Sequence, residues 1–366
     1  MRLLFALPGF HRYDRGAETA LIALATELAR TGFDVTLIGA GPPRPGTPYR
    51  YRRAPAVRRE RFERFPHLPL FRNETAYEEL SFALGLARLY RPGEYDATVT
   101  CAYPFTNWVL RRPAAGRRPL HLFVTQNGDW PAVSDRSEYR FFGCDGLVCT
   151  NPDFFERNKA RWTCALIPNG VDLSRFRPGP PARARFGLPE RSFVVLMVSA
   201  LIQTKRVADG VRAVAEIPGA HLAVAGDGPL RDEVGRLAAE LLPGRFTRLT
   251  LSADDMPALY NSADAFLHLS KEEAFGNVYV EALACGLPVI GHDAPRLRWI
   301  VGDAGLLVDT DRPDAVVRAI GEARSAEARA GERLRQAERF AWETVTAQYR
   351  DFLLHLAARR AGSVGR

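Results

Sequence analysis

The sequence predicts an α/β protein with two doubly wound, Rossmann-like domains, each built on a parallel sheet. Short apolar runs alternate with amphipathic helical stretches along most of the 366 residues. Such alternation calls for parallel strands with helices on both faces of the sheet. The chain is also long enough for two domains of ordinary size. A stretch rich in Pro, Gly and Arg, residues 168–189, separates the two halves and is interpreted as a linker.

The first half opens with a short apolar run and an amphipathic helix. The run is too short for a signal peptide and is followed at once by a Pro-Gly turn, so a buried first strand is expected. The helix is expected at residues 16–30, because Leu21, Leu24 and Leu28 fall on one face. The strands expected here are residues 3–7, 35–39, 97–101, 120–125 and 146–150.

The second half shows the same alternation of strands and helices and ends in a helix. Its expected strands are residues 193–199, 221–225, 248–251, 265–269, 289–291 and 306–308. Near the C-terminus, large apolar residues recur at helical spacing, which predicts an amphipathic helix with one buried face. These residues are Trp342, Val345, Tyr349, Phe352, Leu353 and Leu356.

Two carboxylates flank the expected start of a helix in residues 270–292. Glu273 lies in the loop before the helix, and Glu281 lies about one turn inside it, with seven residues between them. The first amides of a helix lack intrahelical partners and favour an anion, here the amides of Gly276, Asn277 and Val278. A diphosphate suits these amides, and carboxylates accept hydrogen bonds from paired sugar hydroxyls. The pattern therefore fits a nucleotide-sugar, which carries a sugar at either end of a diphosphate.

This segment closely resembles the donor-binding signature of the retaining family 4 glycosyltransferases. In that signature, two glutamates are followed by a helix end of small residues and a Gly-x-Pro-Val strand. The matching residues here are Glu273, Glu281, Ala284, Gly286, Pro288 and Val289. A second match is IPNGVD, residues 167–172, which is similar to the interdomain segment of the same family.

The resemblance implies the GT-B architecture, in which two Rossmann-like domains face a central cleft. Residues 1–170 would form an acceptor-binding domain, completed by the C-terminal helix at 342–360. Residues 171–341 would bind the nucleotide-sugar. Because ligands of open α/β sheets bind beyond the carboxyl ends of the strands, each site motif is expected to follow a strand.

The resemblance also assigns roles in the second domain. Glu273 is expected to bind the donor sugar, and Glu281 the ribose. Lys205, one of only three lysines in the chain, is expected to hold the diphosphate and to stabilise charge on the leaving group. Many relatives carry Arg where this chain has Ala200, so Arg206 is a candidate for the second cation.

Four further donor contacts follow from the same family. Gly226 and Gly228, in a loop after a strand, would let the backbone approach the nucleotide. Phe275 belongs to the donor loop beside Gly276. In the first domain, Gly16 is expected near the donor phosphate, although Arg15 replaces the first glycine of the family's loop.

The sequence TQNGDWP, residues 125–131, follows a strand where relatives often hold a His that contacts the donor sugar. Asp129 is a candidate catalytic residue here, and the competing interpretation is that it caps a turn. The family is thought to react by same-face attack, with the leaving phosphate taking the acceptor's proton.

No metal or cofactor is expected. Residues 309–311, DTD, mimic the DxD motif of another glycosyltransferase fold, but they follow a strand and precede Pro313, so an N-cap aspartate is expected. The five cysteines are scattered and lack CxxC spacing, which indicates free thiols in a reducing cytosol.

The stretch from Arg44 to Arg72 holds nine arginines interleaved with aromatic residues. Two interpretations stand side by side: peripheral contact with an anionic membrane, on the inner face of which a lipid-linked acceptor would lie, or a mobile solvated loop. No recognition motif for nucleic acid accompanies the charge.

Together these features predict a cytoplasmic, metal-independent hexosyltransferase that moves a sugar from a nucleotide diphosphate donor to an acceptor hydroxyl of a glycan or lipid-linked acceptor. Two alternatives share the architecture. One is a nucleotide-sugar 2-epimerase, which would consume donor without an acceptor. The other is a non-catalytic partner subunit that binds the sugar nucleotide, and the intact set of Glu273, Glu281 and Lys205 argues against it.

Overall fold

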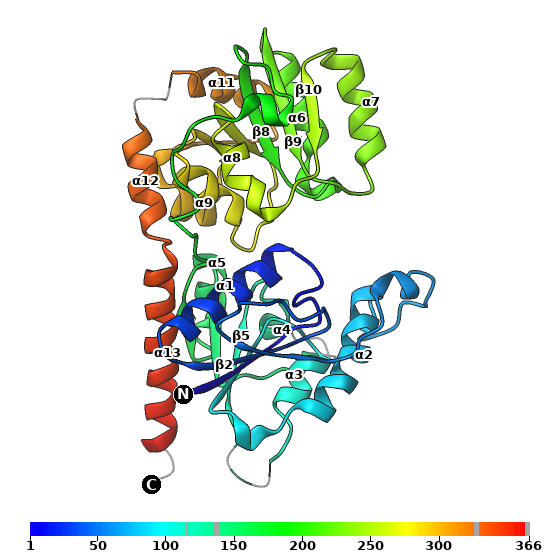
Figure 1. Ribbon diagram of the computed structural model, residues 1–366, viewed down its shortest axis with the longest axis vertical. Helices are drawn as coiled ribbons and strands as arrows, with labels where there is room; N and C mark the ends of the chain where they lie inside the picture. Colours follow the sequence, from blue (N-terminus) through cyan, green and yellow to red (C-terminus); the bar gives the residue numbers. More distant parts are fainter. Residues whose placement is uncertain (115, 117, 135–138, 326–328, 363–366) are drawn as a thin grey trace. The chain divides into compact units, whose positions relative to one another are not determined.

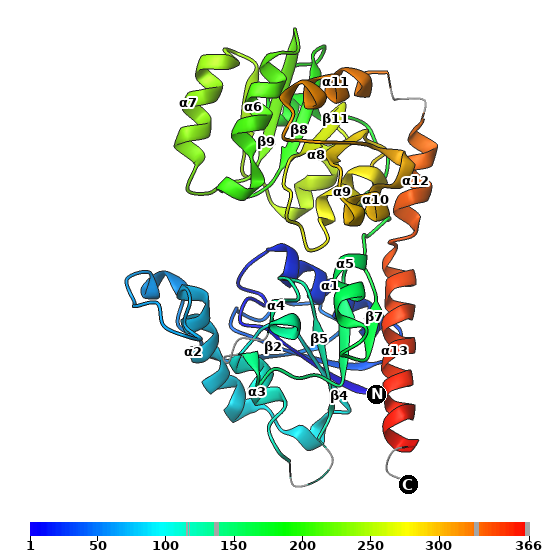
Figure 2. The ribbon, with the colours of Figure 1, turned by 180° about the vertical axis from the view of Figure 1, so that it is seen from behind.

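The computed structural model divides the chain into two compact units (Figures 1 and 2). Unit 1 contains Met1–Gly170 and the C-terminal segment that begins at Trp342, and unit 2 contains Val171–Ala341. The structure describes all residues except 115, 117, 135–138, 326–328 and 363–366.

Unit 1 is built on a seven-stranded parallel sheet with the order β3-β2-β1-β4-β5-β6-β7. The expected strands of the first half are all present, with ends shifted by one residue. The strands are β1 (Arg2–Ala6), β2 (Asp34–Gly39), β3 (Arg50–Arg53), β4 (Ala97–Thr100), β5 (Leu120–Val124), β6 (Gly146–Cys149) and β7 (Cys164–Leu166). The two outermost strands, β3 and β7, were not expected from the sequence.

Helices cover both faces of the unit 1 sheet. They are α1 (Gly16–Arg30), α2 (Glu74–Leu89), α3 (Phe105–Leu110), α4 (Trp130–Val133), α5 (Pro152–Asn158) and α13 (Trp342–Gly362). Successive residues of β1 alternate between two cores, since Leu3 and Phe5 pack with α1 and α13, while Leu4 packs with α2. The long helix α13, red in Figures 1 and 2, runs beside this sheet. Its buried face carries five apolar side chains: Val345, Tyr349, Phe352, Leu353 and Leu356.

The arginine-rich stretch contains two short regular elements and a group of packed aromatic rings. Within it, β3 pairs with β2, and Arg59–Phe62 form a short 3₁₀ helix labelled η1. The rings of Phe62, Phe65 and Phe71 gather around Tyr77 of α2, with centroid separations of 4.6–5.4 Å. These contacts attach part of the stretch to β2 and α2, and both interpretations of its function stay predictions.

Unit 2 is built on a six-stranded parallel sheet with the order β10-β9-β8-β11-β12-β13. Its strands match the expected ones within two residues at either end. They are β8 (Phe193–Val198), β9 (Ala220–Ala225), β10 (Phe246–Leu249), β11 (Ala265–His268), β12 (Val289–His292) and β13 (Leu306–Val308).

Helices also cover both faces of the unit 2 sheet. Those on one face are α6 (Val207–Ala215), α7 (Arg231–Leu241) and α11 (Pro313–Ala323). Those on the other are α8 (Met256–Tyr260), α9 (Asn277–Ala284), α10 (Pro295–Val301) and α12 (Ala330–Glu338). Alternate residues of β8 divide between the two cores, because Val195 faces α6 and Val194 faces the α9 side.

The segment expected to be a linker is largely part of unit 2. Arg183 pairs with Asp264 at 2.7 Å, and Phe186 and Leu188 are buried in the core on the α9 side. The backbone amide of Val171 donates to the carbonyl of Phe340, at 2.8 Å. Residues 171–189 therefore pack as part of the domain instead of tethering it loosely.

Candidate functional site

The candidate site lies where the strand order of unit 2 changes direction. The chain proceeds outward from β8 through β9 to β10, and then returns to β11 on the other side of β8. In open α/β sheets, the crevice at this switch point, beyond the carboxyl ends of the strands, is where ligands bind. Lys205 follows β8, in the 3₁₀ turn Gln203–Lys205, and Glu273 follows β11.

Glu273 and Lys205 form an ion pair, so the structure brings together two of the residues expected to bind the donor. The same carboxylate oxygen, Oε1, also lies 2.8 Å from Nε2 of His268. Burial alone would raise the pKa of Glu273, but the hydrogen bond from His268 and the positive charges nearby outweigh it and hold the pKa at about 2. Glu273 is thus a fixed anion, with its side chain only 14% exposed.

His268 was missed by the sequence analysis. It is the last residue of β11 and is 2% exposed, with its ring stacked on Phe266. A polar residue at the end of an otherwise apolar buried strand is the only signal that the sequence offers for it.

The helix start expected near residue 277 is α9, which begins at Asn277. Its N-cap is Gly276, which has φ +83° and has no side chain with which to cap the first turn. A Cβ atom at this position would lie 2.9 Å from the ring of Tyr279. Glycine is therefore required here by both conformation and space, and no N-cap side chain bonds to the first turn of α9. Val278 follows in the same turn and is partly exposed.

Glu281 lies one turn further along α9 and is held by Tyr260. The Tyr260 hydroxyl donates to Glu281 Oε2 at 2.8 Å. Burial raises the pKa of Glu281, and the bond from Tyr260 acts in the opposite direction. Glu281 is therefore a partly buried acceptor with a single firm partner.

Phe275 does not fit the expected role in donor binding. Its ring is 2% exposed and packs edge-on against Trp299 and Phe340, with centroids 6.4 and 5.6 Å away. Since the side chain is enclosed by the core, it anchors the donor loop from beneath and presents no surface to a ligand.

The glycine loop after β9 supports the turn that carries Lys205. The amide of Leu201 donates to the carbonyl of Asp227 at 2.9 Å. A Cβ atom at Gly226 would lie 1.8 Å from the carbonyl oxygen of Ser199, and one at Gly228 would lie 2.6 Å from that of Leu201. These glycines thus allow two loops to pack backbone against backbone, and their contact with a nucleotide stays a prediction.

Arg206 also departs from expectation, because its guanidinium is already engaged. It lies 2.8 Å from Asp209, 2.9 Å from the hydroxyl of Thr310 and 2.8 Å from the Thr310 carbonyl, with Asp311 at 3.4 Å. Its backbone has φ +54°, in the left-handed region. We therefore assign Arg206 to fixing the turn beside Lys205, not to serving as a second free cation.

The DTD segment takes part in this network and does not cap a helix. Asp309 accepts from the amide of Asp311 at 3.0 Å, and Asp311 pairs with Lys271. The next helix, α11, has Arg312 at its N-cap position, without a side-chain cap bond. The expected N-cap aspartate is therefore wrong.

The remaining two site candidates belong to unit 1. Gly16 is the first residue of α1, and the guanidinium of the preceding Arg15 lies over the ring of Tyr13, 3.9 Å from its centroid. Asp129 is 5% exposed, and its carboxylate accepts from Arg157 at 2.8 and 3.1 Å and from Asn158 at 2.8 Å. Both oxygens are thus committed to α5, so the carboxylate ties α5 to the loop before α4 and is poorly placed for catalysis.

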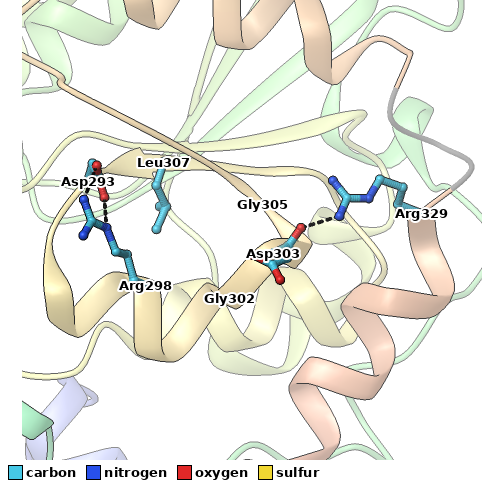
Figure 3. Close-up of a pocket in the computed structure, with 7 residues that line it drawn as sticks. All are labelled: Asp293, Arg298, Gly302, Asp303, Gly305, Leu307 and Arg329. Atoms are coloured by element: carbon cyan, nitrogen blue, oxygen red, sulfur yellow. Dashed lines mark hydrogen bonds and ion pairs between the residues drawn. The ribbon is translucent and has the colours of Figure 1, made fainter.

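A hollow of about 490 Å³ elsewhere in unit 2 is shown in Figure 3. It is lined by Asp293, Arg298, Gly302, Asp303, Gly305, Leu307 and Arg329. Arg298 is paired with Asp293 through two bonds of 2.5 and 2.6 Å, and Arg329 donates to the carbonyl of Asp303 at 2.6 Å. Both arginines of the hollow are therefore already bonded, and none of the expected site residues lines it.

The described residues contain neither a cluster of metal ligands nor a helix suited to span a membrane. No group of three or more His, Cys, Asp or Glu side chains gathers there in a way that could hold a metal ion. In the same residues, no helix combines the length and the apolar character that crossing a bilayer requires.

Comparison with known proteins links both units to the same kind of protein. The family model described as "Glycosyltransferase Family 4" matches residues 15–175, and "Glycosyl transferases group 1" matches residues 180–339. Together the two models cover most of both units.

Two known glycosyltransferases are similar to this chain at moderate sequence identity. A GDP-mannose-dependent alpha-(1-6)-phosphatidylinositol monomannoside mannosyltransferase from Mycolicibacterium smegmatis is 31% identical over 58% of this chain, and the match covers 62% of that relative. The lipopolysaccharide core biosynthesis glycosyltransferase LpsE from Rhizobium meliloti is 26% identical, over 84% of this chain and 85% of that protein.

Among solved structures, HepE from Anabaena, in complex with UDP and glucose, superposes with a TM-score of 0.75. The alignment covers 97% of this chain and 100% of that one, at 19% sequence identity. This likeness and the two parallel sheets confirm the expected GT-B fold.

Proposed function

We propose that this chain, which belongs to glycosyltransferase family 4, is a retaining hexosyltransferase that uses a nucleoside diphosphate sugar. The observation that carries the proposal is the ion pair between Glu273 and Lys205, at the switch point of the sheet where α9 also begins. A helix start, a cation and a fixed carboxylate are the groups that a diphosphate and an attached sugar require.

Each group has a distinct part in the proposed reaction. The first turn of α9 receives the diphosphate, and Lys205 turns from Glu273 toward the phosphate oxygens as charge builds there. Glu273 accepts hydrogen bonds from the hydroxyls of the donor sugar, and Glu281 accepts those of the ribose. The bond between the anomeric carbon and the phosphate oxygen breaks, the acceptor oxygen bonds to that carbon from the same face, and the acceptor's proton passes to the departing phosphate.

We further propose that the reaction needs no divalent metal. Lys205 and the α9 amides would supply the positive charge that a metal ion supplies to diphosphates in other enzymes. Transfer activity should therefore persist in excess EDTA. Loss of activity that added Mg²⁺ restores would contradict this part of the proposal.

The acceptor is proposed to be a lipid-linked sugar or a growing glycan. This rests on the named relatives, one of which acts on a phosphatidylinositol mannoside and another in lipopolysaccharide core biosynthesis. Assays should therefore offer extracted bacterial glycolipids as acceptors beside simple sugars.

The arginine-rich stretch is proposed to bring the enzyme to such acceptors at an anionic membrane. Phe65 is 47% exposed and Leu68 is 50% exposed, although neighbouring rings pack on Tyr77. Three exposed arginines flank them: Arg58, Arg61 and Arg64. Each basic side chain near an anionic bilayer contributes about 1 kcal/mol, and exposed apolar tips add to this.

Co-sedimentation with liposomes tests the membrane proposal. The wild type should pellet with vesicles that contain anionic lipid and much less with neutral ones. Replacing Arg58, Arg61 and Arg64 by Ser should abolish the difference. As a matched control, replacing the exposed unit 2 arginines Arg231, Arg236 and Arg318 by Ser should leave the preference for anionic vesicles unchanged. Equal, negligible pelleting of the wild type with both vesicle types would reject membrane contact.

The central experiment is a binding screen followed by product analysis. Thermal shifts would be measured with UDP-, GDP- and ADP-sugars, and the donor that stabilises the protein would be incubated with the acceptors named above. The new linkage should have the same anomeric configuration as the donor, as read from the one-bond coupling constant between C1 and H1. An inverted product would overturn the retaining mechanism, and donor consumption without an acceptor would favour the epimerase alternative.

A further inference from the structure

Each of the two site glutamates is held through one oxygen only. Glu273 Oε1 takes both the hydrogen bond from His268, at 2.8 Å, and the ion pair with Lys205. Glu281 Oε2 takes the bond from Tyr260, also at 2.8 Å. Within the part of the chain that the structure describes, no partner is recorded for the second oxygen of either carboxylate.

The two side chains that donate to these carboxylates from the core, His268 and Tyr260, belong to one aromatic cluster. Phe266 lies between them, with its ring centroid 5.8 Å from that of Tyr260 and 6.1 Å from that of His268. Tyr279 packs edge-on against both Phe266 and His268, and its hydroxyl donates to the carbonyl of His268 at 3.0 Å. The cluster is buried, with the three phenyl and phenol rings at 0% exposure.

Burial in this cluster fixes where the donors point. A ring enclosed by other rings has one low-energy rotamer and cannot follow a moving partner. A carboxylate bonded to such a donor loses rotational freedom, so its other oxygen is held in one place. Holding a binding group in advance lowers the cost of ordering it when the ligand arrives.

The need of a buried side chain for a hydrogen-bond partner does not by itself explain why Tyr260 and His268 each bond to a carboxylate. Tyr90 in unit 1 is also buried, and its hydroxyl simply donates to the backbone carbonyl of Leu110 at 3.0 Å. Tyr260 and His268 instead each engage a carboxylate at the candidate site. These two carboxylates are the ones expected to meet the two sugar rings of the donor.

We propose that His268 and Tyr260 are positioning residues for the donor, acting at its two ends. His268 fixes Glu273 so that its free oxygen meets the hexose, and Tyr260 fixes Glu281 so that its free oxygen meets the ribose. The inference rests on the proposed function and adds which residue serves which half of the nucleotide-sugar.

The two ends can be separated by comparing two probes in calorimetric binding. UDP and GDP contain the base, the ribose and the diphosphate but no hexose, whereas UDP-glucose and GDP-mannose add the hexose. Tyr260→Phe removes one hydroxyl and should weaken the nucleoside diphosphate and its sugar alike, about tenfold. His268→Phe keeps a ring but loses the donor. It should leave the nucleoside diphosphate within about twofold while weakening the nucleotide-sugar about tenfold.

Two further variants separate positioning from a merely structural role. His268→Gln restores an N–H donor and should recover most of the affinity for the nucleotide-sugar. Tyr90→Phe makes the same chemical change as Tyr260→Phe at a buried site in unit 1, and both probes should bind it like the wild type.

The outcomes keep the inference and the proposed function apart. If the wild type binds neither probe, the proposed function fails and the inference falls with it. If the wild type binds and both site variants bind equally well, only the positioning inference is overturned. Equal weakening of both probes by His268→Phe, without recovery in His268→Gln, would also overturn it, because that result indicates general disruption.

Discussion

At the scale of single residues, Glu273 keeps its negative charge in a nearly buried position because two donors share one of its oxygens. His268 contributes from within the core, and Lys205 contributes from the loop after β8. Burial penalises the charged form, so these partners do more than offset the loss of water. The carboxylate therefore stabilises unit 2 as well as preparing it for a ligand.

This arrangement predicts how stability depends on pH. The pKa of Glu273 is about 2 in the folded protein against an ordinary value of 4.5, so its contribution is fully present above pH 4.5. It is lost as the pH falls from 4.5 toward 2, because the unfolded chain then binds the proton more readily. The contribution is on the order of 3 kcal/mol. In urea denaturation, the free energy of unfolding of the wild type should exceed that of Glu273→Gln by a constant amount from pH 7 to pH 5. This difference should become smaller by pH 3.5. A difference that stays constant to pH 3.5 would contradict the argument.

Lys205 carries the prediction for catalysis. Lys205→Ala should lower the turnover of transfer by about 10²–10³-fold, because the departing diphosphate loses its nearest cation. Binding of the nucleoside diphosphate should fall less, since the first turn of α9 remains. Lys159→Ala is the matched control: Lys159 is an exposed lysine of unit 1, paired at 2.5 Å with Glu156. Full transfer activity in Lys205→Ala would show that the site is assigned wrongly.

The sequence alone names Glu273, Glu281 and Lys205 as candidates, because a motif gives residue types at fixed spacing. The structure pairs Glu273 with Lys205, and the roles of all three stay predictions. The sequence could not find His268 or Tyr260, since each follows apolar residues and lies outside the motif that names the glutamates. Arg206 and Phe275 were predicted to contact the donor because they are next to Lys205 and Gly276 in the sequence. The backbone turns sharply at Arg206, with φ +54°, and the ring of Phe275 points into the core.

At the scale of elements, the site depends on loops that pack backbone against backbone. The loop after β9 can approach the turn after β8 only because Gly226 has no side chain. This requirement concerns the space between two main chains, so a neighbouring side chain cannot relieve it by changing rotamer.

Two glycine substitutions in unit 2 should therefore have opposite effects. Gly226→Ala places a Cβ atom 1.8 Å from the carbonyl oxygen of Ser199, and should lower the free energy of unfolding by about 1–3 kcal/mol. Gly235 lies inside α7, with nothing within 4 Å of its added Cβ, so Gly235→Ala should raise stability by about 0.5–1 kcal/mol. Chemical denaturation of both variants checks the pair. An unchanged midpoint for Gly226→Ala would mean that the loops separate without cost.

The elements that sequence patterns missed are the two edges of the unit 1 sheet. β3 reads RYRR and β7 has three residues, so neither shows the apolar run by which central strands are recognised. Edge strands are often short and charged, because one side of their backbone stays unpaired. These strands form by pairing with β2 and β6, which lie more than ten residues away in the sequence. The pattern of a short sequence window therefore cannot predict them.

At the scale of the whole molecule, the two units differ in how the chain builds them. Unit 2 is one continuous segment, Val171–Ala341, with cores on both faces of its sheet. Unit 1 is discontinuous, because α13 returns from the far end of the chain to cover its sheet beside α1. The amphipathic pattern of α13 predicted one buried face, and the structure shows which core that face completes.

This difference predicts how the chain can be divided. Residues 171–341 alone should unfold in one cooperative transition and bind UDP or GDP, because Lys205, the first turn of α9 and both glutamates lie within them. Residues 1–170 alone should fail to fold cooperatively. They lack the five buried side chains of α13, each worth about 1.5–3 kcal/mol, and the sum of about 10 kcal/mol rivals the stability of a whole domain.

Reconnecting the missing helix supplies the control. Gly170 lies against the ring of Trp342, so a short Gly/Ser linker can join residues 1–170 to 342–362 in their native arrangement. This fusion should regain a cooperative thermal transition, and the same fusion with Tyr349→Ser and Leu353→Ser should not, since both side chains are buried in the shared core. A cooperative transition of residues 1–170 without α13 would contradict this prediction, because it would show that the domain folds without the helix.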